Sequence, residues 1–268
     1  MLIILFFISP SIALHYPKRI ISCTPALTEI LFALKLDREI AGVTTNCNYP
    51  PAAIKKEKIG GFMVNLEKVA SLNPDLVVMQ SDAQKKEIDK LTAHHLPVWS
   101  RDLRTAKELF AAIDELGKVT GRTAEARAVL KGIYKEVARV RARVKGLGRA
   151  RQKVVMIVGL NPLIVVGGGN FIDDCLGWAG ADNIAGKSAA AYPQFSFEKL
   201  VKVDPDAIIL PQGLIRQEEL KNDSRWQKLK AVRGRRVFYI DADIISRPGP
   251  RISTAAGIIA DYLYPPKW

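Results

Sequence analysis

The sequence predicts an α/β fold with two α/β lobes, each built on a parallel-type sheet, joined by one long bridging α-helix. Three observations predict this fold class. A helix–strand unit occurs twice, short apolar runs alternate with helical stretches in both halves, and one uninterrupted helical pattern lies between the halves. Such alternation of strands and helices is typical of parallel sheets that are covered by helices.

The repeated unit consists of two segments that align without a gap. Residues 65–79 read NLEKVASLNPDLVVM and residues 196–210 read SFEKLVKVDPDAIIL, at an offset of 131. Each contains a helix-capping residue, Glu-Lys, a helical stretch, Asn/Asp-Pro-Asp and an apolar strand. The sequence EIAG at 39–42 pairs in the same way with NIAG at 183–186, and the strand near 98–99 pairs with that near 237–239. Three correspondences in the same order indicate an internal duplication.

Short runs of β-branched and apolar residues predict the strands in each half. Residues 19–23 and 154–158 are rich in β-branched side chains and are expected to open the two sheets. Residues 76–79 and 207–210 are continuous apolar runs, which are typical of strands covered on both faces.

One helix of about 25 residues is expected between the halves, because apolar residues recur there at steps of three and four. Gly146 and Gly148 end the pattern. We therefore expect an N-terminal lobe at 14–120, the bridging helix at 121–148 and a C-terminal lobe at 149–268. The apolar positions of the helix are Ala126, Val129, Leu130, Ile133, Val137, Val140 and Val144.

The first thirteen residues, MLIILFFISPSIA, have the apolar run and small terminal residues of a secretory signal peptide. The run is much shorter than the roughly 20 residues of a membrane-spanning helix. A buried first strand is the alternative interpretation. A signal peptide places the protein in the periplasm, where the odd number of cysteines (Cys23, Cys47 and Cys175) leaves at least one thiol unpaired.

Composition excludes several classes of protein. With 268 residues, 48% of them hydrophobic, the chain has ample material for a folded core and is not disordered. The net charge of +13 favours acidic partners, but the basic residues are dispersed and aromatic residues are 7%, which argues against nucleic-acid binding. The three histidines (His15, His94 and His95) and the separated cysteines form no metal-ligand spacing, so we expect no metal site.

Five sequence segments together resemble a known family. They are RIISCTPALTEILFAL at 19–34, NYPP at 48–51, GGFMVNLEKV at 60–69, NPDLVV at 73–78 and RPGPRI at 247–252. In this order they are similar to the periplasmic binding proteins of ABC importers for metal chelates, with the cobalamin-binding type as the best match. The resemblance implies two lobes around a rigid helix, a corrinoid ligand between the lobes, no resident cofactor, a permease dimer in the inner membrane as partner, and a monomeric protein.

The resemblance also implies that Glu67 and Glu198, one in each copy of the repeat, dock onto arginines of the permease dimer. Two matched carboxylates would fit a two-fold partner and fix its register. The local alternative is that each carboxylate only stabilises the first turn of its helix through the helix dipole.

Ligand-binding residues are expected just after the carboxyl ends of the strands, where open α/β sheets bind their ligands. A corrinoid is a broad plate with amide edges, and it suits aromatic faces and a few hydrogen-bonding groups. Local roles as turn, core or surface residues are the alternative for each position. The candidates are Thr24, Asn46, Tyr49, Phe62 and Gln80 in the first half, and Leu163, Tyr192 and Arg247 in the second.

Other functions are weighed against this hypothesis. Asn46 and Gln80 stand where the cobalamin-binding type is expected to have aromatic residues, so haem and ferric siderophores are alternative ligands. An enzyme on a similar two-lobed scaffold is a further alternative. No Ser-His-Asp arrangement, paired carboxylates or nucleotide-binding motif can be assembled from the sequence, so we expect no catalytic residues.

Overall fold

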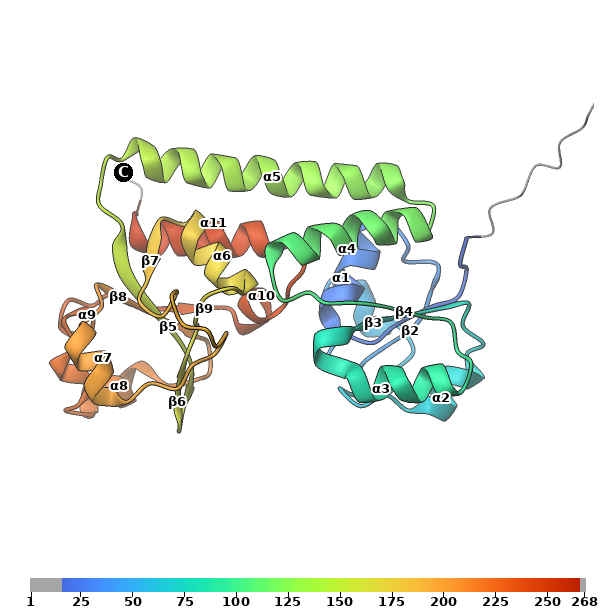
Figure 1. The fold of residues 1–268 in the computed structure, drawn as a ribbon, viewed down its shortest axis with the longest axis horizontal. Helices are drawn as coiled ribbons and strands as arrows, with labels where there is room; N and C mark the ends of the chain where they lie inside the picture. Colours follow the sequence, from blue (N-terminus) through green and yellow to red (C-terminus); the bar gives the residue numbers. More distant parts are fainter. Residues whose placement is uncertain (1–15, 266–268) are drawn as a thin grey trace, which may run out of the picture.

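The computed structural model describes residues 16–265, and the predicted signal peptide at 1–13 lies outside the described residues. Two α/β lobes lie side by side beneath one long helix, α5 (Thr123–Gly146), as Figure 1 shows. This arrangement confirms the fold class expected from the sequence. The bridging helix falls within the segment 121–148 where it was expected, and it packs against helices of both lobes.

The N-terminal lobe has a four-stranded parallel sheet in the order β2-β1-β3-β4. Its core strand β3 is almost entirely buried, as its continuous apolar run predicts. Helices cover both faces of the sheet. The elements are β1 (Ile20–Ser22), α1 (Pro25–Ala33), β2 (Ile40–Val43), α2 (Leu66–Ser71), β3 (Leu76–Gln80), α3 (Ser81–Ala93), β4 (Val98–Arg101) and α4 (Ala106–Val119), with a 3-10 turn at Pro51–Lys55.

The C-terminal lobe repeats this topology, since β7, β5, β8 and β9 pair in the same order as β2, β1, β3 and β4. The duplication seen in the sequence is therefore a duplication of sheet topology. The elements are β5 (Gln152–Leu160), β6 (Leu163–Val165), α6 (Phe171–Trp178), β7 (Ala181–Asn183), α7 (Phe197–Val203), β8 (Ala207–Pro211), α8 (Gln217–Asn222), α9 (Lys230–Arg233), β9 (Val237–Ile240), α10 (Ala242–Ser246) and α11 (Ile252–Leu263), with a 3-10 turn at Trp226–Lys228.

Strand β6 departs from the expected parallel-type sheet, because it pairs antiparallel with β5. Strand β5 is nine residues long and continues beyond the part that pairs with β8. The chain then reverses over Asn161 and Pro162, and only antiparallel strands can be joined by so short a turn.

The capping residues of the repeated unit act as the sequence predicts. The side chain of Asn65 accepts a hydrogen bond from the backbone N–H of Lys68 at the start of α2 (2.9 Å). Ser196 accepts the equivalent bond from Lys199 at the start of α7 (3.1 Å). These bonds satisfy backbone donors that have no partner within the helix.

The main hydrophobic core is continuous across the two lobes. It joins β1 and α1 of the first lobe to β5, α6 and α11 of the second through the buried face of α5. Smaller clusters fill the outer part of each lobe. Among residues 16–265, none of the helices combines the length and the apolar character that crossing a bilayer requires.

Replacement of Ile133 by Ala should destabilise the protein, because this side chain is buried on the lobe-facing side of α5. We expect a loss of about 2–4 kcal/mol in the free energy of unfolding, measured by denaturant titration. Arg141→Ala on the exposed side of the same helix is the control, with an expected change within about 0.5 kcal/mol. Equal losses in both variants would contradict the packing of α5 described here.

Candidate functional site: the cleft between the lobes

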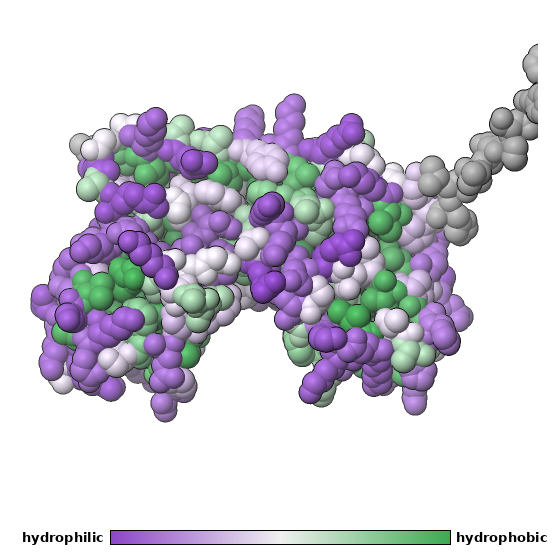
Figure 2. All heavy atoms as spheres, viewed as in Figure 1, coloured by the Kyte–Doolittle hydropathy of each residue, from purple (hydrophilic) through white to green (hydrophobic). Residues whose placement is uncertain are grey.

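A cavity of about 960 Å³ lies between the lobes, lined by residues of both. Figure 2 shows the molecule hollowed between the lobes on the side away from α5. The volume is near the upper end of the roughly 300–1,000 Å³ typical of small-molecule sites, so the cavity suits a large ligand.

The N-terminal wall is built where β3 and β4 end. Gln80 is the last residue of β3, and Asp82 follows in the first turn of α3. Leu103, Arg104 and Thr105 follow β4 and lead into α4. The carboxyl ends of these parallel strands therefore present their side chains to the cavity, as the strand-end rule predicts.

The C-terminal wall is formed by the glycine-rich turn after β6 and by the segment after β7. Gly168 packs so closely on the segment after β7 that an added Cβ would overlap the carbonyl oxygen of Gly186. Asn170 is buried beside this turn, and its side-chain amide donates to the carbonyl oxygens of Gly167 and Ala191 (both 3.1 Å). The side chain of Asn170 thus ties together the two segments that line the wall.

The cavity lining is polar, and its charges balance. Arg104 and Lys187 carry positive charge, whereas Asp82 and Glu108 carry negative charge. Tyr192 is half-exposed at the wall, and partial burial together with the nearby Asp82 raises the pKa of its phenol. The phenol therefore stays protonated and can donate a hydrogen bond to a ligand.

Two of the eight candidate ligand-binding residues, Gln80 and Tyr192, line the cavity. Phe62 is 58% exposed in the loop before α2, and Tyr49 is 44% exposed with the guanidinium of Arg251 above its ring (4.1 Å). Thr24 is buried as the N-cap of α1. The remaining candidates also lie outside the cavity lining: Asn46 is exposed, Leu163 is partly buried in β6 and Arg247 is buried.

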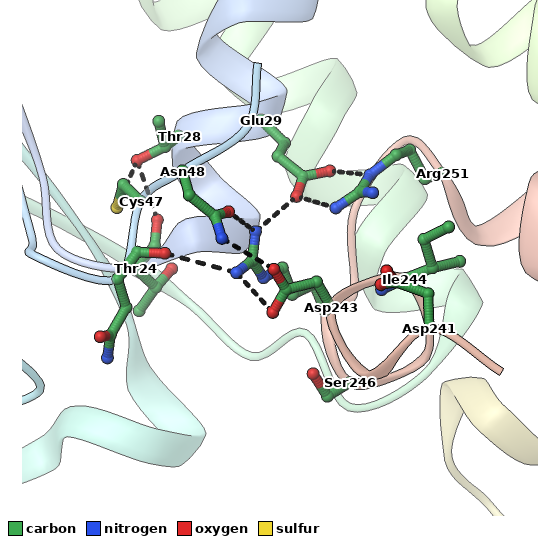
Figure 3. A network of polar contacts seen from close by, with 12 residues as sticks. Thr24, Thr28, Glu29, Cys47, Asn48, Asp241, Asp243, Ile244, Ser246 and Arg251 are labelled. Carbon is green, nitrogen blue, oxygen red and sulfur yellow. Dashed lines mark hydrogen bonds and ion pairs between the residues drawn. The ribbon is translucent and has the colours of Figure 1, made fainter. Parts of the chain in front are cut away.

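Arg247 belongs to a buried ionic network that connects the lobes, drawn in Figure 3. Glu29, buried on α1, accepts hydrogen bonds from Arg251 (2.6 and 2.8 Å) and from Arg247 (3.3 Å). Arg247 also pairs with Asp243 (2.7 Å) and donates to Asn48 (2.7 Å). We call the contacts of Glu29 with Arg247 and Arg251 the inter-lobe clasp.

The clasp positions part of the cavity. Ser246 and Pro248, the neighbours of Arg247 in the chain, line the cavity, whereas the Arg247 guanidinium is directed toward Glu29. A ligand anion at Arg247 would have to compete with Glu29 and Asp243. The arrangement therefore indicates that Arg247 fixes the positions of Ser246 and Pro248 in the cavity lining.

Glu67 and Glu198 occupy equivalent exposed positions in the first turns of α2 and α7. Within residues 16–265 neither carboxylate forms an ion pair. Helices α2 and α7 lie on different lobes and on the side of the molecule away from α5 (Figure 1). Hydrogen bonds from its own backbone N–H and from Ser196 lower the pKa of Glu198, so its carboxylate is charged at neutral pH.

The part of the chain that the structure describes contains no cluster of three or more His, Cys, Asp or Glu side chains that could hold a metal. Cys23, Cys47 and Cys175 are all free and buried, which is consistent with the expected unpaired thiol. Burial raises the pKa of the Cys23 and Cys175 thiols, so they are unreactive. His94 is the C-cap residue after α3, and His95 follows it.

The sequence interpretation missed two segments of the cavity lining. Residues 103–105, 186–189 and 191 line the cavity, yet they were not among the candidates. Both follow strands, β4 and β7 respectively, so the strand-end rule applied to every strand would have found them.

Comparison with known proteins places this geometry in a family. The sequence profile of the family described as "Periplasmic binding protein" matches residues 20–244. The chain is 31% identical to an uncharacterized ABC transporter substrate-binding lipoprotein, YvrC, of Bacillus subtilis, over 93% of this chain and 81% of that protein. It is 26% identical to the vitamin B12-binding protein of Vibrio parahaemolyticus, over 94% of this chain and 91% of that protein.

A solved structure agrees with these matches. A possible iron-binding (periplasmic solute-binding) protein from Staphylococcus epidermidis superposes with a TM-score of 0.82 at 27% identity, covering 93% of this chain and all of that one.

The inter-lobe clasp should contribute strongly to stability, because removing one member leaves buried charge without compensation. We expect Glu29→Gln to lower the free energy of unfolding by about 3 kcal/mol in denaturant titration. Glu115→Gln breaks an exposed pair with Arg101 and serves as the control, at about 1 kcal/mol or less. If both variants unfold at the same denaturant concentration, the clasp has no special role.

Proposed function

The chain belongs to the periplasmic binding protein family, and on that premise we propose that it captures a corrinoid outside the cytoplasmic membrane and delivers it to an ABC importer. The observation that carries the proposal is the cavity of about 960 Å³ between two rigidly connected lobes. The relatives of this chain are named for substrate binding and transport, so we assign the protein binding and no covalent catalysis.

The polar lining of the cavity supports a corrinoid. The edge of a corrinoid carries many neutral amides, which need hydrogen-bond donors and acceptors without a net charge. Gln80, Ser188 and Tyr192 offer such groups, and the four ionic side chains of the lining balance one another. Polar groups at the edge of a broad site fix the orientation of a ligand.

The lining favours a corrinoid over haem. Haem iron requires an axial ligand such as His, Cys, Met or Tyr. Tyr192 alone among these types lines the cavity within residues 16–265, so haem would have a single candidate axial ligand there. The two haem propionates would also require an excess of cations, and Asp82 and Glu108 offset those present.

Aromatic contact with the ligand is proposed for Tyr192 and Phe62. Tyr192 lies at the cavity wall of the C-terminal lobe, and Phe62 lies in the N-terminal lobe at nearly the equivalent position of the repeat. Both rings are about half exposed, which leaves their faces available to a flat ligand.

Glu67 and Glu198 are proposed to dock the loaded protein onto the permease. They are exposed, lie on different lobes and have no ion-pair partner in the described part of the chain. A two-fold partner with basic residues would meet one carboxylate on each lobe, and this fixes the orientation of docking.

Calorimetric titration with cyanocobalamin, haemin and a ferric hydroxamate tests the ligand. We expect saturable one-to-one binding of cyanocobalamin and an affinity about tenfold lower for Tyr192→Ala, because a large contact face is lost. Tyr134→Ala on α5 is the matched control and should leave the affinity unchanged. Preference for haemin or the hydroxamate would reassign the ligand, and binding of none would reject the proposal.

The double variant Glu67→Gln, Glu198→Gln tests docking. We expect it to bind ligand as well as the unmodified protein but to lose most of its stimulation of ATP hydrolysis by the reconstituted importer, since exposed charges mainly guide association. Glu218→Gln, an exposed acid in the first turn of α8, is the control. Full stimulation by the double variant would exclude the docking role.

A further inference from the structure

The face formed by α4, α5 and α6 carries an aromatic cluster that the ligand cleft does not use. Phe110 of α4 contacts Tyr134 of α5 edge-to-face, with ring centroids 5.1 Å apart. It stacks on Trp178 of α6 at 6.3 Å. We call these three rings the aromatic row. It crosses from the N-terminal to the C-terminal lobe, and Tyr134 at one end is 54% exposed.

Four exposed cations border the aromatic row. Lys107 lies on α4, and Arg127, Lys131 and Lys135 lie on α5. None of the four has a carboxylate within ion-pair distance in residues 16–265, whereas the neighbouring Lys118 and Arg139 are paired with Asp114 and Glu136. Two carboxylates lie on the same face: Asp114 is paired with Lys118, and Asp174 accepts a hydrogen bond from the backbone N–H of Ala106 (2.9 Å). The face therefore combines aromatic surface with four cations that have no ion-pair partner in the described residues.

The spacing of the α5 cations gives them a common direction. Arg127, Lys131 and Lys135 are four residues apart, so they form one row along the helix. Like charges at this spacing repel one another and weaken the helix slightly. An extended anionic surface would relieve that repulsion along the whole row.

We propose that this face binds the anionic headgroup surface of a phospholipid bilayer. Lysine and arginine side chains near such a surface are attracted by its negative potential. Tyr and Trp rings prefer the headgroup level, where an apolar body and a polar tip are both satisfied. The helix α5 provides a straight edge about 36 Å long, and hydrophilic side chains project along it in Figure 2.

Charge argues against a second copy of this chain as the occupant. Two chains of net charge +13 that met through their basic rows would repel each other. Helix α5 also lies on the side of the molecule opposite α2 and α7, which carry Glu67 and Glu198 (Figure 1). Lipid contact at α5 turns those two carboxylates away from the same bilayer, so lipid contact and docking onto a permease in that bilayer are alternative orientations of the protein.

Co-sedimentation of the full chain with vesicles of equal parts phosphatidylglycerol and phosphatidylethanolamine tests the proposal at about 0.1 M salt. We expect Lys131→Glu with Lys135→Glu to weaken binding by about tenfold or more, because attraction becomes repulsion. Tyr134→Ser should weaken it by about threefold through loss of the interfacial ring. All variants share the same N-terminal residues, so any contribution of these residues to vesicle binding is the same in each. A difference in binding between the unmodified chain and a variant therefore reports on the substituted side chains.

Lys202→Glu with Lys221→Glu is the matched control, since it changes the net charge equally on α7 and α8. It should retain most of the binding. An equal loss in the control, or no binding of the unmodified chain, would overturn the proposal. Binding to soluble polyglutamate but not to vesicles, lost in the same variants, would assign the face to an acidic polypeptide instead. Circular dichroism melting establishes that each variant is folded.

Discussion

The buried Glu29 carboxylate, shared by Arg247 and Arg251 of the opposite lobe, is the contact on which the geometry of the cleft depends. A buried carboxylate is tolerated only when its charge and its lone pairs are satisfied, and here both conditions are met from across the lobe boundary. The lobes therefore cannot separate at this point without exposing Glu29 and leaving the Arg251 guanidinium without its ion-pair partner, whereas Arg247 keeps Asp243 of its own lobe. Because the continuous core under α5 also joins the lobes, packed side chains as well as the clasp connect the two walls of the cleft.

A preformed cleft has a consequence for binding. Little conformational entropy is lost when the ligand enters a site whose walls are already in place, so more of the contact energy appears as affinity. The side chain of Asn170 and the clasp act together here, because one holds the C-terminal wall and the other holds the segment 246–248. Residues that contact no ligand thus determine the shape that the ligand meets.

The sequence predicted most of the fold because its signals were local. The caps Asn65 and Ser196, the apolar runs of β3 and β8 and the three-to-four periodicity of α5 each report on neighbouring residues, and each was found where it was expected. The site was only partly predictable. Gln80 is the last residue of β3 and follows directly from the strand-end rule, whereas 186–192 lie in a long loop after β7, and no local pattern shows which of its residues line the cavity. The clasp could not be derived, because Glu29 and Arg251 are separated by 222 residues and no local pattern connects them.

The duplication explains why the exposed glutamates Glu67 and Glu198 occur as a matched pair, whereas the basic row of α5 occurs once. The repeated unit gives each lobe one exposed glutamate at the same place, so the matched acids arise from a single ancestral position. The helix α5 has no counterpart in the repeat, because one copy serves both lobes. Its basic row is consequently free of the two-fold constraint that the proposed docking would place on Glu67 and Glu198. The two proposed interactions therefore differ in symmetry: docking would use one glutamate from each lobe, whereas lipid binding would use the single row of Arg127, Lys131 and Lys135 on α5.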